Sequence, residues 1–324
     1  MRGWTIFAAV CLSGAGPAAV QSGLRYHVVH GWPQLPGDEM LDEVSAVAVD
    51  GHDDVLVLTR AGRQWPDKGE LDTSPIAKPT IFRFDGRTGR LTSRFGAGMF
   101  ALPHSITVDA RQNIWIADVA LHQVFKLSPD GRLLLALGTR AVSGEDARHF
   151  NRPSDVAIGR DGSIFVSDGY GNNRVAKFDR TGRFLLSWGS KGSAAGQFNL
   201  PHGIASDNKG RLCVDDRGNA RIQCFNEDGR WRLTLKGPPF ASPQDVKFDH
   251  SGRLFVVEAG SSDPLVLPGV VVLDGNGRAL ERFGRYGNYD GQFVDAHWLA
   301  IDSRGAVYVA DFGGKRVQKF VRER

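Results

Sequence analysis

The sequence has few cysteines, no cluster of basic residues and no apolar segment long enough to cross a bilayer. Its 40 Lys and Arg residues are scattered among 36 acidic residues along 324 positions. A protein that binds nucleic acid gathers such charges into one patch or stripe, so we expect no nucleic-acid partner. The apolar run at residues 4–12 is much shorter than the roughly 20 residues of a membrane-spanning helix, so we expect no membrane partner.

The first residues have the plan of a secretory signal peptide. A single arginine precedes the apolar run, and small residues follow it as far as Ala18 and Ala19, where we place the cleavage site. We therefore expect residues 1–19 to be a signal peptide and the mature protein to be secreted or periplasmic.

The cysteines fit an oxidising compartment. Of the three, Cys11 lies in the expected leader, which leaves Cys213 and Cys224. These two belong to RLCVDDRGNARIQCF, in which a polar turn joins two strand-like runs. An even pair placed in this way favours a disulfide across the hairpin, and two reduced core thiols are the alternative.

A unit of roughly 40–50 residues recurs along the chain, and this is the spacing of β-propeller blades. One copy reads LPHSITVDARQNIWIADVALHQVFKLSPDGRLLLALG, and each copy contains short apolar or alternating runs separated by polar turns. The six copies begin near residue 44 and at residues 102, 152, 200, 242 and 295. Four strands per copy predict an all-β fold, a six-bladed β-propeller whose units resemble the NHL repeat.

The last copy ends near residue 320 after only three runs, so it lacks an outer strand. Residues 24–33, LRYHVVHGWP, have the pattern of an outer strand and precede the first full copy. We expect this N-terminal strand to complete the last blade and to close the ring, which leaves no open sheet edge. Residues 24–324 are thus expected to form one propeller domain, acting as a monomer.

One position near the start of the innermost strand carries histidine in alternate copies. From the first copy to the last, this column holds Ser45, His104, Ser154, His202, Gln244 and His297. Equivalent positions on alternate blades of a six-bladed ring are related by rotations of about 120°, so three imidazoles would converge on the axis. Three histidines with one open position are the ligand set of a catalytic zinc. In the alternative, each histidine caps a turn or bonds a buried carbonyl.

A second column lies where the second strand of each copy ends. Arg60 and Arg217 hold equivalent places there, and Tyr170 sits one residue past that register. Two arginines and a tyrosine at one mouth of a metal-bearing ring favour an anionic substrate, such as a carboxylate held by charge-assisted hydrogen bonds. Ion pairs of the arginines with nearby aspartates, and simple packing of Tyr170, are the alternatives.

Several longer segments resemble the peptidyl-α-hydroxyglycine α-amidating lyases. They are LPHSITVD, DVALHQVFKL, VSDGYGNNR, GQFNLPHGIA, LCVDDRGNARIQCF and the final H-x-x-A-x-D. The resemblance runs from about residue 44 to residue 320. It implies an enzyme that cleaves the C–N bond of a peptidyl-α-hydroxyglycine, or of a similar carbinolamide, to give an amide and glyoxylate.

The resemblance also implies a role for each member of the two columns. These roles are zinc ligation by His104, His202 and His297, base catalysis by Tyr170, binding of substrate charge by Arg60 and Arg217, and a disulfide between Cys213 and Cys224. Zinc would acidify the carbinol hydroxyl, and Tyr170, with its pKa lowered by zinc and arginine, would take the proton before the C–N bond breaks.

One departure from the family concerns calcium. The family holds a structural calcium through two backbone carbonyls, which Val47 and Ile106 match, and through an aspartate, which Trp298 replaces. Tryptophan has no side-chain oxygen to offer this ion. The resemblance therefore implies zinc as the cofactor and leaves calcium with only the two carbonyl positions.

Two further departures follow the same comparison. Asp295 replaces a methionine two residues before the last histidine and brings a charge near the expected zinc. Asn151 and Gly171 stand where the family has the two cysteines of a second disulfide. Since both partners are replaced together, we expect the remaining disulfide to suffice.

The substrate and its source have alternatives. We expect a peptide substrate supplied by a separate monooxygenase, or else a small carbinolamide that carries a carboxylate. A lactonase-like metallohydrolase on the same fold is a second possibility, although such sites rely on Asp, Glu and Asn rather than histidine. A non-catalytic NHL-repeat scaffold is the third, and the loss of the calcium aspartate favours it.

Overall fold

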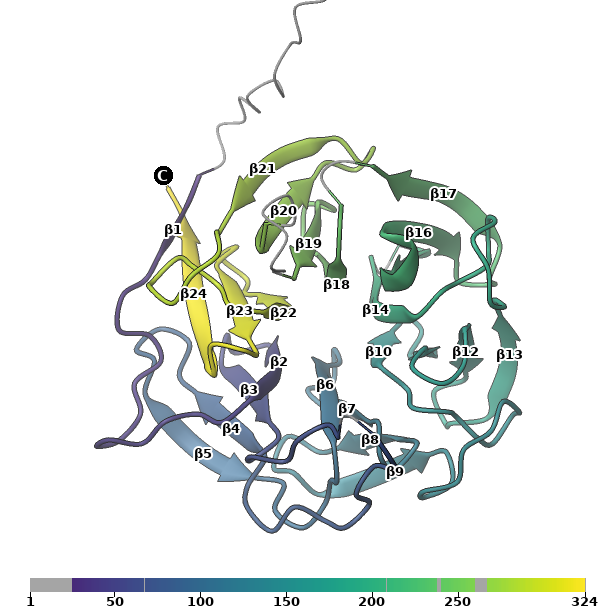
Figure 1. Cartoon of the computed structure of the whole chain (residues 1–324), viewed down its shortest axis with the longest axis horizontal. Helices are drawn as coiled ribbons and strands as arrows, with labels where there is room; N and C mark the ends of the chain where they lie inside the picture. Colours follow the sequence, from purple (N-terminus) through teal and green to yellow (C-terminus); the bar gives the residue numbers. More distant parts are fainter. Residues whose placement is uncertain (1–24, 67, 208, 238–239, 260–266, 324) are drawn as a thin grey trace, which may run out of the picture.

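The computed structural model describes residues 25–66, 68–207, 209–237, 240–259 and 267–323. Over these residues the chain forms six four-stranded antiparallel sheets, arranged as blades around one axis (Figure 1). This arrangement confirms the predicted six-bladed propeller. No helix in the described part of the chain is long and apolar enough to cross a membrane. The expected signal peptide at residues 1–19 lies outside the described residues.

Each of the first three blades runs from an innermost strand to an outermost one. Blade 1 consists of β2 (Val44–Val49), β3 (Val55–Thr59), β4 (Ile81–Phe84) and β5 (Leu91–Phe95). Blade 2 consists of β6 (Pro103–Val108), β7 (Ile114–Asp118), β8 (Gln123–Leu127) and β9 (Leu133–Leu137). Blade 3 consists of β10 (Asp155–Ile158), β11 (Ile164–Asp168), β12 (Arg174–Phe178) and β13 (Phe184–Trp188).

The other three blades follow the same order. Blade 4 consists of β14 (Pro201–Ser206), β15 (Arg211–Asp216), the 3-10 turn η1 (Arg217–Asn219), β16 (Arg221–Asn226) and β17 (Trp231–Lys236). Blade 5 consists of β18 (Pro243–Phe248), β19 (Leu254–Glu258), β20 (Gly269–Leu273) and β21 (Ala279–Phe283). Blade 6 consists of β22 (Ala296–Ile301), β23 (Val307–Asp311), β24 (Arg316–Arg322) and β1 (Tyr26–Val28).

The inner and outer strands differ in pattern because they differ in burial. Every residue of β11 and of β19 is buried, since both faces of an inner strand pack against neighbouring blades. The outer strand β13 alternates between exposed and half-buried residues. Continuous apolar runs therefore mark the inner strands, and alternating runs mark the rim.

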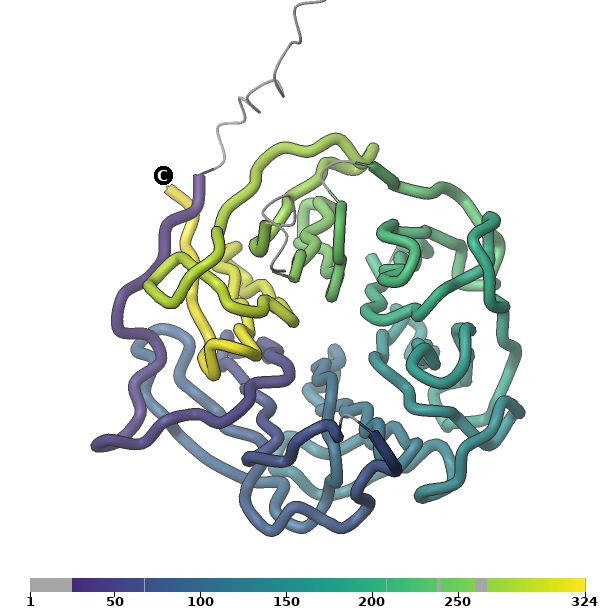
Figure 2. The backbone as a smooth tube through the Cα atoms, in the orientation of Figure 1, coloured from purple at the N-terminus to yellow at the C-terminus, as the bar shows by residue number. Residues whose placement is uncertain are grey.

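The N-terminal strand closes the ring. In the antiparallel pair of β1 and β24, Tyr26 lies opposite Arg322 and Val28 lies opposite Phe320. Tyr26 also stacks on Phe283 of blade 5, with ring centroids 4.7 Å apart. Figure 2 shows the two ends of the described chain side by side in this blade. The prediction that an N-terminal strand completes the last blade is confirmed, and β1 is that strand.

The aspartate that ends the second strand of most copies holds the loop before the innermost strand. In blade 2 the carboxylate of Asp118 accepts hydrogen bonds from the backbone N–H groups of Ala101 (2.8 Å) and Leu102 (3.0 Å). Asp216 and Asp311 bond the corresponding loops of blades 4 and 6. Because this loop leads into the innermost strand, the repeated aspartate fixes the place where the histidine column begins.

Cys213 of β15 and Cys224 of β16 form the expected disulfide. The two residues lie directly opposite each other in the strand register, and their Cα atoms are 4.1 Å apart. The strand register of the hairpin therefore brings the two cysteines together.

The double substitution Cys213→Ser/Cys224→Ser is expected to lower the melting temperature by roughly 5–10 °C. A cross-link over a loop of this length stabilises the folded state by about 3 kcal/mol in the chain-entropy model. Differential scanning calorimetry of the variant and of the parent, the latter with and without a reductant, measures the effect. An unchanged melting temperature in both comparisons would contradict a stabilising role.

Candidate active site

Three buried histidines meet at the axis of the propeller. His104, His202 and His297 lie near the starts of β6, β14 and β22, and one ring nitrogen of each lies within 4.8 Å of the others. In Figure 1 these innermost strands, on alternate blades, surround the centre of the ring. The structure thus brings together the three histidines that the repeat places in one column.

Each histidine ring is oriented by the next blade. Its Nδ1 atom bonds to the backbone carbonyl of the column residue that follows it around the ring. The pairs are His104 with Ser154 (2.7 Å), His202 with Gln244 (2.5 Å) and His297 with Ser45 (2.6 Å). The other members of the column therefore fix the tautomer of the histidines and leave each Nε2 as the remaining ligand atom. A bond from each histidine to a buried carbonyl was the alternative drawn from the sequence, and in the structure it orients the same rings that form the cluster.

All three imidazoles are neutral at ordinary pH. Burial lowers the pKa of His104 and of His202 well below the usual range, and it lowers the pKa of His297 to about 3. The positive charge of Arg217 acts in the same direction on all three, and that of Arg60 does so on His104 and His297. Metal ions bind the neutral imidazole, so no proton has to be displaced first. Three neutral, oriented nitrogens fit the donor set of a catalytic zinc.

The hydroxyl of Tyr170 lies against two of these histidines. Its oxygen is 3.0 Å from Nε2 of His104 and 2.8 Å from Nε2 of His202. Burial raises the pKa of Tyr170, and Arg217 and Arg60 act against that increase. In the chain alone the loss of hydration outweighs the two arginines, and the lowered pKa expected from zinc and arginine together stays a prediction.

Tyr170 and the two arginines occupy the same place in their blades. The backbone N–H of Tyr170 bonds to the carbonyl of Arg152, and those of Arg60 and Arg217 bond to the corresponding carbonyls of blades 1 and 4. The extra residue of blade 3 is Gly169, where a Cβ would lie 1.8 Å from a backbone oxygen of the neighbouring blade. Only glycine fits there, and this absorbs the one-residue offset in the sequence.

The two arginines lie beside Tyr170 and the histidines. Arg60 is only 5% exposed, and its guanidinium lies 4.8 Å from the ring centroid of Phe312 and 5.9 Å from that of Trp65. The buried Nε of Arg60 has no hydrogen-bond partner among the described residues. Arg217 lies near Tyr170, and its positive charge opposes the rise in the pKa of that hydroxyl. A buried guanidinium with an unused donor is suited to an anion that enters from solution.

Two aromatic residues beside Arg60 were not predicted from the sequence. Trp65 lies in the insertion at 61–78, and its ring centroid is 4.9 Å from that of Tyr170. Phe312 holds in blade 6 the register place that Arg60 holds in blade 1. The second column could have indicated Phe312, whereas a single tryptophan in a polar insertion gave no signal.

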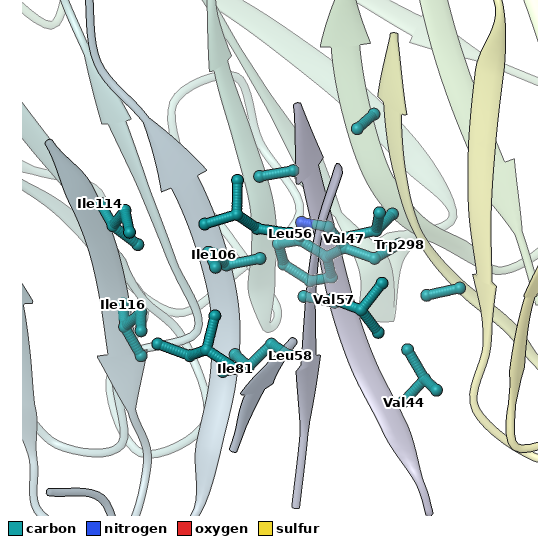
Figure 3. Packing of buried hydrophobic residues seen from close by; sticks show 14 of the residues in the cluster. Val44, Val47, Leu56, Val57, Leu58, Ile81, Ile106, Ile114, Ile116 and Trp298 are labelled. Carbon is teal, nitrogen blue, oxygen red and sulfur yellow. The ribbon is translucent and has the colours of Figure 1, made fainter. Parts of the chain in front are cut away.

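Trp298 lines the other side of the histidine cluster. Its indole is fully buried and lies with its centroid between 5.4 and 5.7 Å from the three imidazoles. Figure 3 shows it among the side chains around Val47 and Ile106, the two positions expected to offer carbonyls to calcium. Calcium takes six to eight oxygen ligands, and an indole supplies only an N–H donor. The residues at this place do not fit calcium.

The structure also shows where the other two departures from the family lie. Asp295 is half-buried beside the arginines: burial raises its pKa, and Arg217 and Arg60 act against this. Asn151 and Gly171 are neighbours, since the N–H of Gly171 bonds to the carbonyl of Asn151 at 2.9 Å. The place of the second disulfide is therefore kept in the fold without its cysteines.

Comparison with known proteins identifies relatives over most of the chain. The family model "NHL repeat" matches residues 150–178 and 198–225. The chain is 30% identical over 299 residues to a probable peptidyl-alpha-hydroxyglycine alpha-amidating lyase of Caenorhabditis elegans, and the match covers 86% of this chain and 82% of that protein. It is 33% identical over 334 residues to the peptidyl-glycine alpha-amidating monooxygenase of Mus musculus, and this match covers 95% of this chain and 33% of that protein. The chain thus spans about a third of the length of the mouse protein.

Solved structures share the architecture at low identity. A gluconolactonase of Xanthomonas campestris superposes with a TM-score of 0.62 and 15% sequence identity, and the match covers 96% of this chain and 99% of that chain. At this identity the likeness shows the fold alone, so it gives no support to lactonase chemistry in this chain.

Proposed function

We propose a zinc-dependent reaction for this chain, which belongs to the peptidyl-α-hydroxyglycine α-amidating lyase family and is an enzyme of the lyase type in peptide amidation. In this proposal it cleaves the C–N bond of a peptidyl-α-hydroxyglycine, or of a similar carbinolamide. The products are an amide and glyoxylate. The observation that carries this proposal is the meeting of three neutral histidines with the hydroxyl of Tyr170.

The arginines give the site its preference for a carboxylate. Arg60 offers a buried Nε that has no hydrogen-bond partner in the described part of the chain, and the positive charge of Arg217 acts on the neighbouring Tyr170. A carboxylate between them would form charge-assisted hydrogen bonds, and the carbinol carbon next to it would be held near the histidines. The aromatic rings of Trp65 and Phe312 keep water from the guanidinium of Arg60 and so strengthen that interaction.

Tyr170 is the base in this proposal. Zinc at His104, His202 and His297 would supply a Lewis acid that lowers the pKa of a hydroxyl and polarises it. The positive charges of the arginines and of the cation both favour the ionised form of Tyr170 against the effect of burial. The phenolate oxygen takes the proton of the substrate hydroxyl, and the C=O bond of glyoxylate forms as the C–N bond breaks. The proton then held on Tyr170 passes to the amide nitrogen, which restores the base.

The setting of the reaction is part of the proposal. The disulfide between Cys213 and Cys224 supports an oxidising compartment, in keeping with the export expected from residues 1–19. We propose that a separate monooxygenase supplies the hydroxylated substrate and that the propeller acts as a monomer.

Asp295→Asn is expected to lower the KM for a carboxylate-bearing substrate by about 3–10-fold, with a smaller change in kcat. Asp295 places a negative charge beside Arg217 and Arg60, where it competes with the substrate carboxylate for the same cations. Steady-state kinetics with α-hydroxyhippurate measures the change. Asp228→Asn, in an exposed outer turn, is the matched control, and an equal KM for both variants would contradict the competition.

The function itself is tested by its products. Purified protein incubated with α-hydroxyhippurate should release benzamide and glyoxylate in equal amounts, whereas gluconolactone, offered as a control substrate, should not be hydrolysed. Release of neither product in the presence of zinc would refute the proposed reaction, and hydrolysis of the lactone alone would favour the lactonase reading.

A further inference from the structure

Lys247 belongs to the innermost strand β18 and lies against Trp298, the neighbour of the histidine cluster. The Nζ atom of Lys247 is 2.5 Å from a carboxylate oxygen of Asp245 and 3.5 Å from one of Asp155. It also lies 5.0 Å from the ring centroid of Trp298, within the range of a cation–π contact. Both aspartates are fully buried, and a cavity of about 410 Å³ at the far ends of the innermost strands reaches Lys247.

The carboxylates that meet this lysine also tie blades together. Asp155 of blade 3 accepts a hydrogen bond from the backbone N–H of Ile204 in blade 4, at 2.9 Å. Asp245 of blade 5 accepts one from the N–H of Leu299 in blade 6, at 3.1 Å. Because Lys247 contacts both carboxylates, a single ammonium group links four consecutive blades across the ring.

We propose that the ammonium group of Lys247, held against Trp298, is the structural cation of this propeller and replaces the divalent ion that the resemblance had implied. The inference does not depend on the proposed reaction, because it concerns the charges that join the blades. Three observations support it. The side chain that should offer calcium an oxygen is an indole, the ring contains a paired ammonium, and that ammonium bridges acidic groups on different blades.

The ammonium of Lys247 is the counter-charge of two buried carboxyl groups. Burial lowers the pKa of Lys247, but Asp155 and Asp245 outweigh this effect and raise it, so the lysine stays charged. Burial also raises the pKa of both aspartates, and Lys247 acts against that. Without the ammonium, two buried carboxyl groups would face each other with no counter-charge, which is strongly destabilising.

The test uses the full chain, both with and without added zinc, and reads melting temperature and calcium content, not turnover. The parent is expected to hold no calcium and to show no change in melting temperature when calcium is added. Lys247→Met is expected to lower the melting temperature by about 5–10 °C. Lys236→Met, at an exposed position of β17, is the matched control and is expected to leave the melting temperature unchanged.

Two double variants complete the design. Lys247→Met/Asp245→Asn removes the unbalanced carboxylate and is expected to recover much of the loss; if Lys247→Met does not fold, recovery of a folded protein in this variant supports the proposal equally. Lys247→Met/Trp298→Asp is expected to gain calcium binding and a calcium-dependent rise of about 5 °C. The proposal is overturned if the parent contains one calcium per chain or if Lys247→Met has the same melting temperature as Lys236→Met. It is also overturned if Lys247→Met/Trp298→Asp neither binds calcium nor changes its melting temperature when calcium is added.

Discussion

Replacing Tyr170 with phenylalanine is expected to lower kcat for α-hydroxyhippurate by about 10²–10⁴-fold, the usual worth of a positioned base. The hydroxyl of Tyr170 lies 3.0 and 2.8 Å from two ligand nitrogens, so its oxygen is placed where a hydroxyl bound at the cluster would meet it. Phenylalanine keeps the ring and its contact with Trp65 and removes only the oxygen. The loss should therefore fall on kcat more than on KM.

The matched control for this substitution is Tyr286→Phe, since Tyr286 is exposed and lies outside the site. Zinc content should stay near one per chain in both variants, which separates loss of the base from loss of the metal. If the Tyr170→Phe enzyme had the same turnover as the control, Tyr170 would not be the base. The reaction would then need another proton acceptor near the histidines.

His202→Ala is expected to reduce zinc content far below one per chain and to bring glyoxylate release down to the uncatalysed background. The substitution removes one of three ligand nitrogens and leaves the carbonyl of Gln244 without the imidazole that bonds it. The two histidines that remain cannot supply the three protein ligands of a catalytic zinc site. Elemental analysis after dialysis and a glyoxylate assay measure the two effects on the same sample.

An exposed histidine provides the control for that experiment. His250→Ala, in a surface turn of blade 5, should keep both zinc and turnover. If His202→Ala kept the zinc and the activity of this control, the cluster would be a structural feature and not the catalytic centre.

The ring was predictable from the sequence because each copy contains its own pattern of strands and turns. The aspartate at the end of the second strand, seen at Asp118, bonds the loop before the innermost strand, so the spacing within a copy fixes the same local geometry each time. The closing strand could be inferred as well, since the last copy lacked an edge that residues 24–33 could supply. Periodicity then placed the histidines on alternate blades, and three-fold convergence followed from the ring alone.

The register of Tyr170 shows how far counting along the sequence can go. Its position is one residue past that of Arg217, yet its backbone bond is the equivalent one. The reason is that Gly169 lies so close to the next blade that no side chain fits. A contact of this kind between blades cannot be read from either copy alone.

Other parts of the site were beyond sequence reasoning for the same reason. Trp65 reaches Tyr170 from an insertion without a counterpart in the other copies. Lys247 meets Asp155 across two blades, and nothing in the spacing of these residues marks them as partners. The replacement at Trp298 was visible in the sequence, but the lysine that accompanies it was not.

The central claim, that the three histidines hold the zinc of an amidating lyase, is tested most directly by titrating zinc into metal-free protein while glyoxylate release from α-hydroxyhippurate is followed. We predict that the metal-free protein stays folded but inactive, and that the rate rises linearly until about one zinc per chain is bound, in keeping with one three-histidine site. A rate that is already full without zinc, or that stays at background at every zinc concentration, would contradict the account.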